Sequence, residues 1–392
     1  MVHLADKNKC TGCSACASSC PNGCITMVWD REGFAFPSIN NGACLNCELC
    51  RKACPVLNVK ERNSKNTLAY AAYTMDTDLR MESSSGGIFS EISKEVLKRN
   101  GVIYGAAYDK NFRVIHKCVD QYESLDSLRR AKYSQSDLGN CFPEIKKRLE
   151  YGQRVLFSGT PCQVAGLQSF LGKYYENLIC IDFVCHGVPS PMVWEQYVLY
   201  RSNLDSQGSL PQHINLRCKE SGWSKYSYSV DFSYGNGVRH LCKNSEDEFM
   251  KMFVNDYILR KSCGCCQEKG YERKSDITLG DFWGIWDVAP EMDDDKGTSL
   301  VLVHSEKGHS MIEQISHRIR IKAVKLNQAS QMNMAMIEPI KHQKVRGDIL
   351  DAILKDGFQP LQTLLQNQTG MKQSIISKTK KIMMNALYIR NK

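Results

Sequence analysis

Residues 10–21 read CTGCSACASSCP and residues 44–55 read CLNCELCRKACP. Both stretches follow one spacing, CxxCxxCxxxCP. A 4Fe-4S cluster needs four thiolate ligands: three cysteines two residues apart wrap a loop around three iron corners, and the fourth cysteine of each run binds the other cluster. The pattern therefore predicts two clusters and the transfer of single electrons. The first cluster would be held by Cys10, Cys13, Cys16 and Cys54, and the second by Cys44, Cys47, Cys50 and Cys20.

Two other uses of clustered cysteines fit this pattern less well. Zinc sites usually pair two CxxC elements across a spacer, rather than running three cysteines and then a fourth. Disulfides need an oxidising compartment, whereas the segment Met1–Lys9 lacks the apolar core of a signal peptide. The 19 cysteines of the chain therefore point to a reducing, cytoplasmic location.

The composition is that of a globular protein. With 392 residues, of which 42% are hydrophobic and 24% charged, the chain can bury a large core, and its length predicts two or three units. No run of about 18 apolar residues occurs, so no membrane-spanning helix is expected. The formal net charge is +9, but much of this excess lies in the acid-free segment Gly357–Lys392. The remainder argues against a general nucleic-acid surface.

The same basic segment contains an amphipathic pattern. Apolar residues recur at helical spacing between Ile375 and Leu387, opposite Lys378, Lys381 and Asn385. We interpret the pattern as a helix that docks on its own domain or on a twin subunit in a homo-oligomer. Peripheral membrane contact and docking of a partner protein are the alternatives.

Alternating strands and helices follow the cysteine-rich segment, after a polar linker at residues 60–66. Strands are expected at residues 68–75, 102–108, 154–157 and 178–185. An amphipathic helix is expected after the small-residue segment 83–87, ending near Arg99. This alternation predicts α/β architecture, in which ligands usually bind at the carboxyl ends of the strands.

A β-rich stretch interrupts the alternation. Aromatic and aliphatic residues alternate with polar ones from Tyr226 to Tyr234, Asn236-Gly237 is a strong hairpin turn, and Val238–Cys242 forms the returning strand. We expect the aromatic residues to share one packed sheet face. A base-stacking surface for nucleic acid would need basic residues between the aromatic ones, and serines and an aspartate stand there instead.

Four further cysteines occupy places where ligands could lie. Cys162 is in the loop after one strand, Cys185 ends another strand, and Cys263 and Cys266 form a CxxC. Four thiols on loops at one end of a sheet could hold a third 4Fe-4S cluster, although free cysteine is also a favoured small core residue. The core explanation suits the cysteines inside strand-like or helix-like segments, namely Cys118, Cys141, Cys180, Cys218 and Cys242. Two extra thiols beside expected ligands stay open: Cys24 and Cys265.

A two-electron product would require a group that converts single electrons into pairs. A flavin does so, since it exchanges electrons one or two at a time. The candidate site for its phosphates is Ser83-Ser84-Ser85-Gly86-Gly87, where small residues let backbone amides at a helix N-terminus approach an anion. An ordinary helix N-cap is the alternative explanation.

Six separated motifs run in order along the chain within residues 1–290. They are SSSGGIFSEI, AKYSQSDLG, VLFSGTPCQVAGL, DFVCHGVPSP, the CxxC at Cys263 and Cys266, and DITLGDFWG. Together they resemble the beta subunit family of coenzyme F420 hydrogenase and dehydrogenase. The resemblance implies an iron-sulfur flavoprotein, in which an α/β domain holds FAD and a 4Fe-4S cluster lies beside the flavin.

The resemblance also implies roles for individual residues. The cluster beside the flavin would be ligated by Cys162, Cys185, Cys263 and Cys266. The residues assigned to the cofactor or substrate would be Ser85, Gly86, Gly87, Lys132, Tyr133, Gln135, Ser136, Thr160 and Asp281. The first three of these would lie against the FAD pyrophosphate, and Asp281 would orient the flavin or close the sheet. For Lys132 a surface charge is the alternative, since Arg129 and Arg130 precede it.

The chain departs from the minimal hydrogenase subunit at both ends. It carries its own ferredoxin-like two-cluster module, and it continues for about 100 residues beyond the last motif, through Met332, Met334, Met336 and the basic segment. We expect a module at residues 1–58, a flavin domain in two parts at 67–145 and 146–325, and a helical basic tail at 326–392. The predicted fold class is α/β or α+β.

These patterns predict a cytoplasmic iron-sulfur flavoprotein oxidoreductase. Electrons from a ferredoxin-like donor, or from a hydrogenase or dehydrogenase partner subunit, would reach FAD through the clusters, and a hydride would pass to or from coenzyme F420 or another organic acceptor. No pair of side chains suggests a catalytic acid and base. Two alternatives are an electron-relay subunit without its own substrate, serving polysaccharide biosynthesis for example, and a metal-binding scaffold in a glycan-assembly complex.

Overall fold

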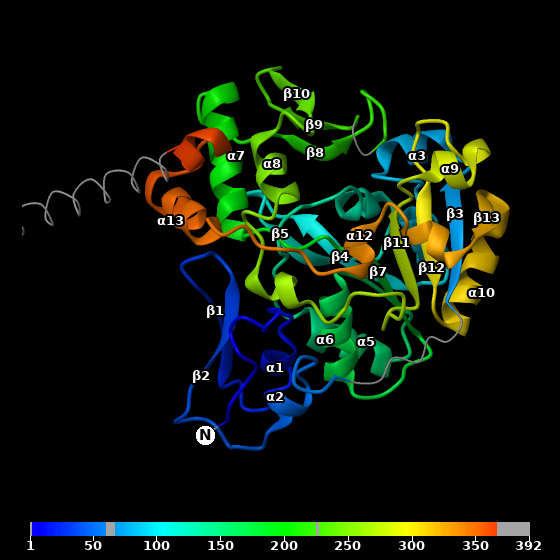
Figure 1. The fold of residues 1–392 in the computed structure, drawn as a ribbon. Coiled ribbons are helices and arrows are strands. Elements are labelled where there is room, and N and C mark those ends of the chain that lie inside the picture. The colour runs from blue at the N-terminus through cyan, green and yellow to red at the C-terminus, as the bar shows by residue number, and fades with distance from the viewer. Residues whose placement is uncertain (1, 60–66, 225–226, 367–392) are drawn as a thin grey trace, which may run out of the picture.

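The computed structural model describes residues 2–59, 67–224 and 227–366 (Figure 1). The expected linker at 60–66 and the expected helix between Ile375 and Leu387 therefore lie outside the described residues. The described chain forms a small N-terminal module and a large α/β domain. Helix α1 (Ala15–Ser18) of the module contacts α5 (Cys141–Glu150) and α6 (Pro161–Leu171) of the domain. This arrangement confirms the predicted fold class.

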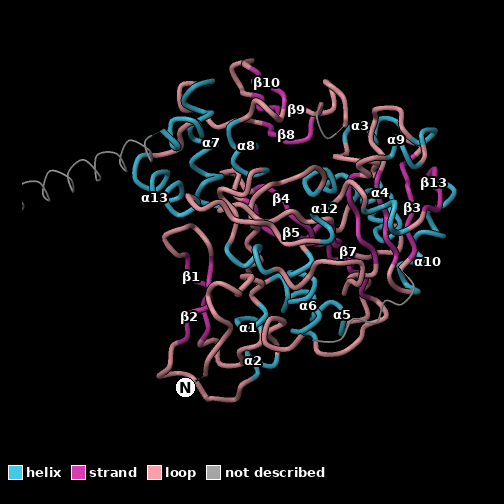
Figure 2. The backbone as a smooth tube through the Cα atoms, viewed as in Figure 1, coloured by secondary structure: helices cyan, strands magenta, loops and turns pink. Residues whose placement is uncertain are grey.

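The N-terminal module has little regular structure, as the trace in Figure 2 shows. It contains two short helices, α1 (Ala15–Ser18) and α2 (Leu49–Lys52), and one antiparallel hairpin, β1 (Ile25–Trp29) and β2 (Ala35–Ile39). Its own apolar cluster is small and consists of Val2, Cys24, Ile25 and Cys50, whereas Cys13 and Ala15 are buried against the large domain. So small a core is typical of domains whose folding depends on bound metal.

An eight-stranded mixed sheet forms the centre of the large domain. Its strand order is β13-β3-β12-β11-β7-β6-β4-β5. The four central strands β4, β6, β7 and β11 are parallel, and the outer strands join them in antiparallel pairs. The bounds are Leu68–Thr74 (β3), Val102–Tyr108 (β4), Val114–Val119 (β5), Val155–Ser158 (β6), Leu178–Phe183 (β7), Ile277–Asp281 (β11), Ser299–Val303 (β12) and Ile319–Val324 (β13).

Helices cover both faces of this sheet. One face packs Leu156 with α4 and α10, and the other packs Val155 and Phe157 with α5 and α6. Since successive strand residues point to opposite faces, a strand covered on both sides is apolar throughout, which explains the continuous apolar runs of the central strands. The helices are α4 (Ile88–Leu97), α5 (Cys141–Glu150), α6 (Pro161–Leu171) and α10 (Glu306–Ile315).

A second, three-stranded sheet lies at the other side of the domain. It consists of β8 (His213–Cys218), β9 (Ser229–Ser233) and β10 (Arg239–Lys243). The expected hairpin is confirmed, since β9 and β10 pair on either side of Asn236-Gly237, where Gly237 has φ +83°. The expected packed face is confirmed too: Tyr228, Val230, Phe232 and Tyr234 are buried in one core with α7 and α8. Tyr226 lies outside the described residues.

The remaining elements complete this frame. They are α3 (Thr77–Glu82), α7 (Pro191–Ser206), α8 (Glu248–Val254), α9 (Ile285–Val288), α11 (Leu326–Ser330), α12 (Met334–Ile337), α13 (Arg346–Asp356), and 3-10 helices at Tyr122–Leu128, Lys261–Cys265, Pro290–Met292 and Ser316–Arg318. Residues 326–366 belong to the large domain, because α11 contacts β3 and α13 packs on α7. Within the described ranges, no helix is long and apolar enough to cross a membrane.

Buried polar contacts hold the module against the large domain. Arg346 of α13 donates to the Glu32 carboxylate at 2.8 Å and to the carbonyl oxygen of Leu259 at 2.6 Å. The Ser190 hydroxyl donates to the Glu32 carbonyl oxygen at 2.6 Å. At Gly33, which has φ +76°, a Cβ would lie 2.3 Å from the Cβ of Met192. The tip of the β1–β2 hairpin is therefore closely fitted to the domain.

We expect Arg346→Met to destabilise the protein by about 3–5 kcal/mol, because it leaves the Glu32 carboxylate buried without its main partner. Urea denaturation of the cluster-loaded chain measures the loss. The matched control is Arg113→Met, which breaks an ion pair with Glu195 whose side chains are 58% and 36% exposed, and which should cost about 0–1 kcal/mol. Equal losses in the two variants would contradict the role given to Arg346.

Candidate functional site

The first N-terminal ligand set is brought together at the contact with the large domain. The thiols of Cys13 and Cys16 both interact with those of Cys10 and Cys54. Burial, with a smaller contribution from repulsion by Cys10 and Cys54, raises the pKa of Cys13 to about 11. Cys13 also packs on α6, where a Cβ at Gly166 would lie 2.9 Å from the Cys13 sulfur. This set of four thiols therefore faces the domain directly.

The second N-terminal set lines a small cavity within the module. Cys20, Cys44, Cys47 and Cys50 are its four expected ligands, and Cys24 lines the same cavity. The sulfur of Cys24 lies 3.2 Å from that of Cys20. Cys47 is exposed to solvent, whereas Cys24 and Cys50 are buried. Cys24, whose role the sequence left open, is thus a fifth thiol beside the second set.

A third group of thiols lies at one edge of the large sheet. Cys162 is in the first turn of α6, directly after β6, and Cys185 follows the end of β7 by two residues. Cys263 lies in a 3-10 helix and Cys266 ends it. All six pairs among these four thiols interact electrostatically. Because β6 and β7 are parallel neighbours, their carboxyl ends place Cys162 and Cys185 at the same edge.

The chemistry of this donor set suits an iron-sulfur cluster. Burial raises the pKa of Cys185 to about 12 and that of Cys263 to about 11, and it raises the pKa of Cys162 and Cys266 as well. Four partly buried thiols with raised pKa values lose their protons readily only to a metal centre, so binding and proton release would be coupled. Lys269 donates to the carbonyl oxygen of Cys185 at 2.6 Å, which places a cation beside the group.

Two adjoining cavities extend from this group along the carboxyl edge of the sheet. The larger, of about 880 Å³, is lined by Cys185 among others. The smaller, of about 300 Å³, reaches the loop before α4. The residues that line both cavities include Lys132, Tyr133, Phe183, Arg217 and Asp281. Each of the two volumes is of the size that cofactor sites occupy.

The loop Ser83–Gly87 forms one end of the smaller cavity. Ser85 and Gly87 line it, and the hydroxyl oxygens of Ser84 and Ser85 are buried without a hydrogen-bond partner among the described residues. Gly87 is the N-cap of α4 with φ +82°. Gly86 packs closely on the sheet, because a Cβ added to it would lie 2.4 Å from the carbonyl oxygen of Ala72. Gly86 therefore lets the loop pack on the sheet and does not line the cavity.

Most of the other expected pocket residues line the cavities, and one of them contacts the module instead. Ser136 and Thr160 line the larger cavity, and Lys132 and Tyr133 line both. Burial, followed by the charge of Arg130, lowers the pKa of Lys132 to about 7, so Lys132 is more than a surface charge. The Gln135 side chain points elsewhere: its amide donates to the carbonyl oxygen of Thr11 at 3.0 Å. Gln135 thus contacts the iron-sulfur module.

Several polar residues at the cavities were not expected from the sequence. Arg217 donates to Asp281 at 2.9 Å, and the other carboxylate oxygen of Asp281 is buried with no partner among the described residues. Lys219 donates to the carbonyl oxygens of Arg80, Ser85 and Lys296 and so supports the Ser83–Gly87 loop. The His186 Nε2 lies 2.7 Å from an Asp256 carboxylate oxygen in the larger cavity. An isolated cation or histidine belongs to no spacing motif, so the sequence alone does not identify it as a site residue.

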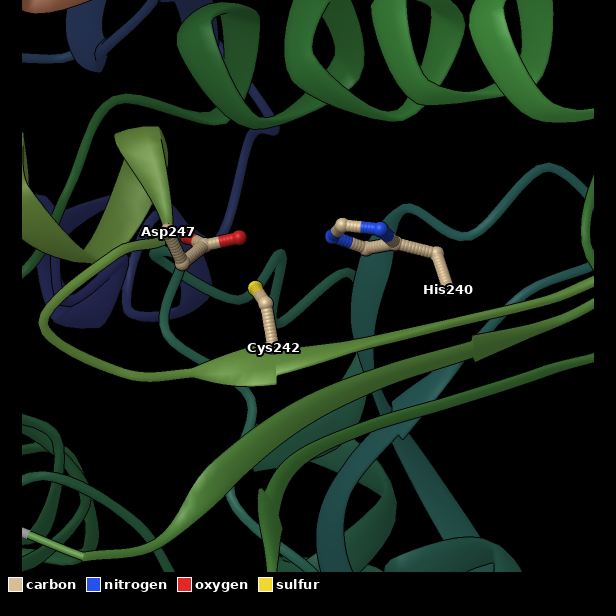
Figure 3. Close-up of side chains that lie close together, drawn as sticks. All are labelled: His240, Cys242 and Asp247. Atoms are coloured by element: carbon tan, nitrogen blue, oxygen red, sulfur yellow. The ribbon is translucent and has the colours of Figure 1, made fainter.

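One more thiol lies near possible metal ligands, in the second sheet. The ligand atoms of His240, Cys242 and Asp247 lie within 4.8 Å of one another (Figure 3). However, one Asp247 oxygen accepts from the backbone N–H of Met250 at 2.8 Å, as the N-cap of α8, and the other accepts from the Tyr197 hydroxyl. These two hydrogen bonds explain the position of Asp247 without a metal ion. Cys118, Cys141, Cys180 and Cys218 also lie in strands and a helix, as expected.

Comparison with protein families matches two parts of this arrangement. Residues 9–58 match the 4Fe-4S dicluster domain, and residues 152–329 match the C terminus of the beta subunit of coenzyme F420 hydrogenase/dehydrogenase. Residues 152–329 of the chain therefore form the C-terminal domain of an F420 hydrogenase/dehydrogenase beta subunit. The resemblance deduced from the sequence motifs is thereby confirmed. The third thiol group and most residues of the larger cavity lie within residues 152–329, whereas most residues that line the smaller cavity precede them. The first two thiol groups belong to the dicluster domain.

Individual relatives resemble parts of the chain. Pyruvate synthase subunit PorD of Methanothermobacter marburgensis is 37% identical over 60 residues, which are 15% of this chain and 64% of that subunit. This chain therefore spans somewhat less than two thirds of the length of that relative. A chain of the F420-reducing [NiFe] hydrogenase complex of Methanosarcina barkeri shares 14% identity, with a TM-score of 0.46 over 71% of this chain and 92% of that chain.

If Cys162, Cys185, Cys263 and Cys266 hold one cluster, Cys162→Ser should remove about four irons per chain and leave the N-terminal clusters in place. Iron and sulfide analysis after anaerobic purification measures this loss. Cys180→Ser is the matched control, since Cys180 is a buried thiol of β7 outside the group, and should keep its iron. A Cys162→Ser variant with full iron content would contradict the ligand assignment.

Proposed function

We propose that this chain is an iron-sulfur flavoprotein oxidoreductase. It would pass electrons between a ferredoxin-like donor or a partner subunit and an organic acceptor, coenzyme F420 or a compound that takes its place. The observation that carries the proposal is the position of the third thiol group. Cys162 and Cys266 line a cavity of about 220 Å³ together with Thr11 and Pro55 of the module, and Cys185 lines the large cavity of the domain.

The position of the third thiol group, between the module and the large cavity, suggests a role for each part of the chain. Bound clusters would carry single electrons, and a bound flavin would supply the chemistry that combines two of them with one proton as a hydride. The protein holds the first and third thiol groups at one interface, and it holds the third group at the wall of the large cavity. Both cysteine arrangements fit a cubane, because each provides four thiols in one place. The chain therefore provides a continuous series of sites from the module to the cavities.

The smaller cavity fits the phosphates of FAD. Helix α4 begins there and is ten residues long, so its unpaired backbone N–H groups and positive end favour an anion. The free hydroxyls of Ser84 and Ser85 add donors at the same place. Arg129 and Arg130 line the cavity as well. Lys219 keeps the loop in position through its bond to the Ser85 carbonyl oxygen at 2.7 Å.

The junction of the two cavities suits the reacting end of the cofactor and its acceptor. Asp281 offers one buried oxygen to a bound N–H group, while Arg217 holds the other oxygen at 2.9 Å. Lys132 lies at the same junction, and bonds to the carbonyl oxygens of Arg129 and Arg130 fix its ammonium group. These residues can orient polar groups of a bound ring without breaking bonds themselves. A partner protein is supported by the hydrogenase, dehydrogenase and pyruvate synthase subunits to which parts of the chain are similar.

Anaerobic purification followed by iron, sulfide and flavin analysis tests the proposal. Three cubanes and one flavin predict about twelve irons and one FAD per chain. Steady-state assays with reduced F420, NADH and NADPH against a viologen would then identify the acceptor. Eight irons without flavin would instead indicate an electron-relay subunit. Protein without iron would overturn the proposal and favour a scaffold.

We expect Lys132→Met to lower the FAD content or the kcat/KM for the acceptor by at least about tenfold, because it removes the amino group from the junction of the cavities while keeping the length of the apolar stem. Flavin fluorescence after denaturation and steady-state kinetics measure the two effects. The iron content should not change. Lys117→Met on β5 is the matched control, since Lys117 is exposed, and an equal effect there would contradict the assignment of Lys132.

A further inference from the structure

Arg260 lies at the contact between the first and third thiol groups. Its guanidinium group donates to the carbonyl oxygen of Cys10 at 2.9 Å and to that of Ala35 at 3.0 Å, both in the module. Its side chain is almost fully buried, at 1% exposure. A buried guanidinium requires a complete set of acceptors, and the module supplies two of the three found here.

The third acceptor comes from the large domain. The Gln135 side-chain oxygen accepts from Arg260 at 2.9 Å, and the Gln135 amide donates to the carbonyl oxygen of Thr11 at 3.0 Å. Arg260 and Gln135 thus hold the backbone of residues 10 and 11 together. The next residue, Gly12, has φ +69°, and a Cβ on it would lie within 2.9 Å of the side chains of Arg260 and Gln135. The first ligand loop is therefore fitted against this pair.

The backbone of Arg260 is joined to the third thiol group. Its N–H donates to the carbonyl oxygen of Val188, three residues after Cys185, and its carbonyl oxygen accepts from the N–H of Cys263. Phe36 of the module stacks under the guanidinium, with its ring centroid 4.2 Å away. One residue thus connects the backbone segments that carry ligands of both groups.

The charge of Arg260 acts on both groups as well. Its guanidinium interacts electrostatically with the thiols of Cys10, Cys162 and Cys263. Cys10 belongs to the first group, and the other two belong to the third. In a buried environment such interactions are screened weakly. A fixed positive charge between two clusters would favour the reduced, more negative state of each.

We propose that Arg260 is the positioning residue for electron transfer between the first and third clusters. It fixes the separation of their ligand loops and raises the reduction potentials of both. In the step itself one electron would leave a cluster held by Cys10, Cys13, Cys16 and Cys54, which would be oxidised, and would arrive at a cluster held by Cys162, Cys185, Cys263 and Cys266, which would be reduced. No proton or further reactant is needed. The inference rests on the proposed function, which supplies the third cluster and the single-electron donor.

The test compares three variants of the full chain, purified anaerobically with their iron contents measured. Arg260→Met removes both the charge and the hydrogen bonds. Arg260→Lys keeps the charge and loses most of the bonds. Gln135→Leu keeps the charge of Arg260 and removes only the hydrogen bonds of the Gln135 side chain to Arg260 and Thr11. Redox titration followed by electron paramagnetic resonance measures the midpoint potential of each cluster, and rapid reduction by dithionite measures transfer between them.

Arg260→Met should lower the potentials of the first and third clusters by an amount that changes their reduction equilibria at least about tenfold, which is about 59 mV for one electron. Arg260→Lys should keep the wild-type potentials, and the second N-terminal cluster should change less than the other two in every variant. Gln135→Leu should slow transfer between the clusters without moving their potentials.

Unchanged potentials in an iron-replete Arg260→Met variant would overturn the inference. If Arg260→Met fails to load iron, Arg260→Lys decides. Potentials that fall in an iron-replete Arg260→Lys variant would show that the charge of Arg260 does not set them, which also overturns the inference. Failure of the proposed function is distinguishable, since wild-type protein would then contain about eight irons or none and would lack the third signal.

Discussion

The parallel pairing of β6, β7 and β11 is the constraint on which the rest of the structure depends. Parallel neighbours send all their carboxyl ends to one edge of the sheet, and each needs a crossover before the next. Cys162 follows β6, Cys185 follows β7, and Asp281 ends β11. The third thiol group and both cavities lie along that edge because these three strands run in the same direction.

The iron-sulfur module depends on the large domain for its placement. Its own core is small and consists partly of cysteines. Cys13 and Ala15 join the apolar core beside α5 and α6 of the large domain, but apolar contacts are non-directional. Buried cations supply specific contacts instead: Arg346 reaches Glu32, and Arg260 reaches the carbonyl oxygens of Cys10 and Ala35. A buried guanidinium without its acceptors is costly. These contacts therefore define one orientation of the module rather than a range of orientations.

The pocket residues show where prediction from the sequence ended. Lys132, Tyr133, Ser136 and Thr160 were expected at a pocket and line the cavities, whereas the side chain of Gln135 lies on the module and Gly86 packs on the sheet. A motif identifies a loop, but neighbouring residues of a loop point in different directions. The missed residues Arg217, Lys219 and Arg260 occur singly, so no spacing in the sequence distinguishes them from surface cations.

The sequence by itself determined the local features of this protein: the two cysteine runs, the apolar strands, the hairpin at Asn236-Gly237 and the motifs of the F420 hydrogenase/dehydrogenase beta subunit. These features depend on residues a few positions apart, whose geometry follows from the backbone. Only the tertiary structure decided that Cys162 and Cys266 lie beside Thr11 and Pro55 of the module. Residues so far apart in the chain meet through packing and buried polar contacts, which no short segment contains.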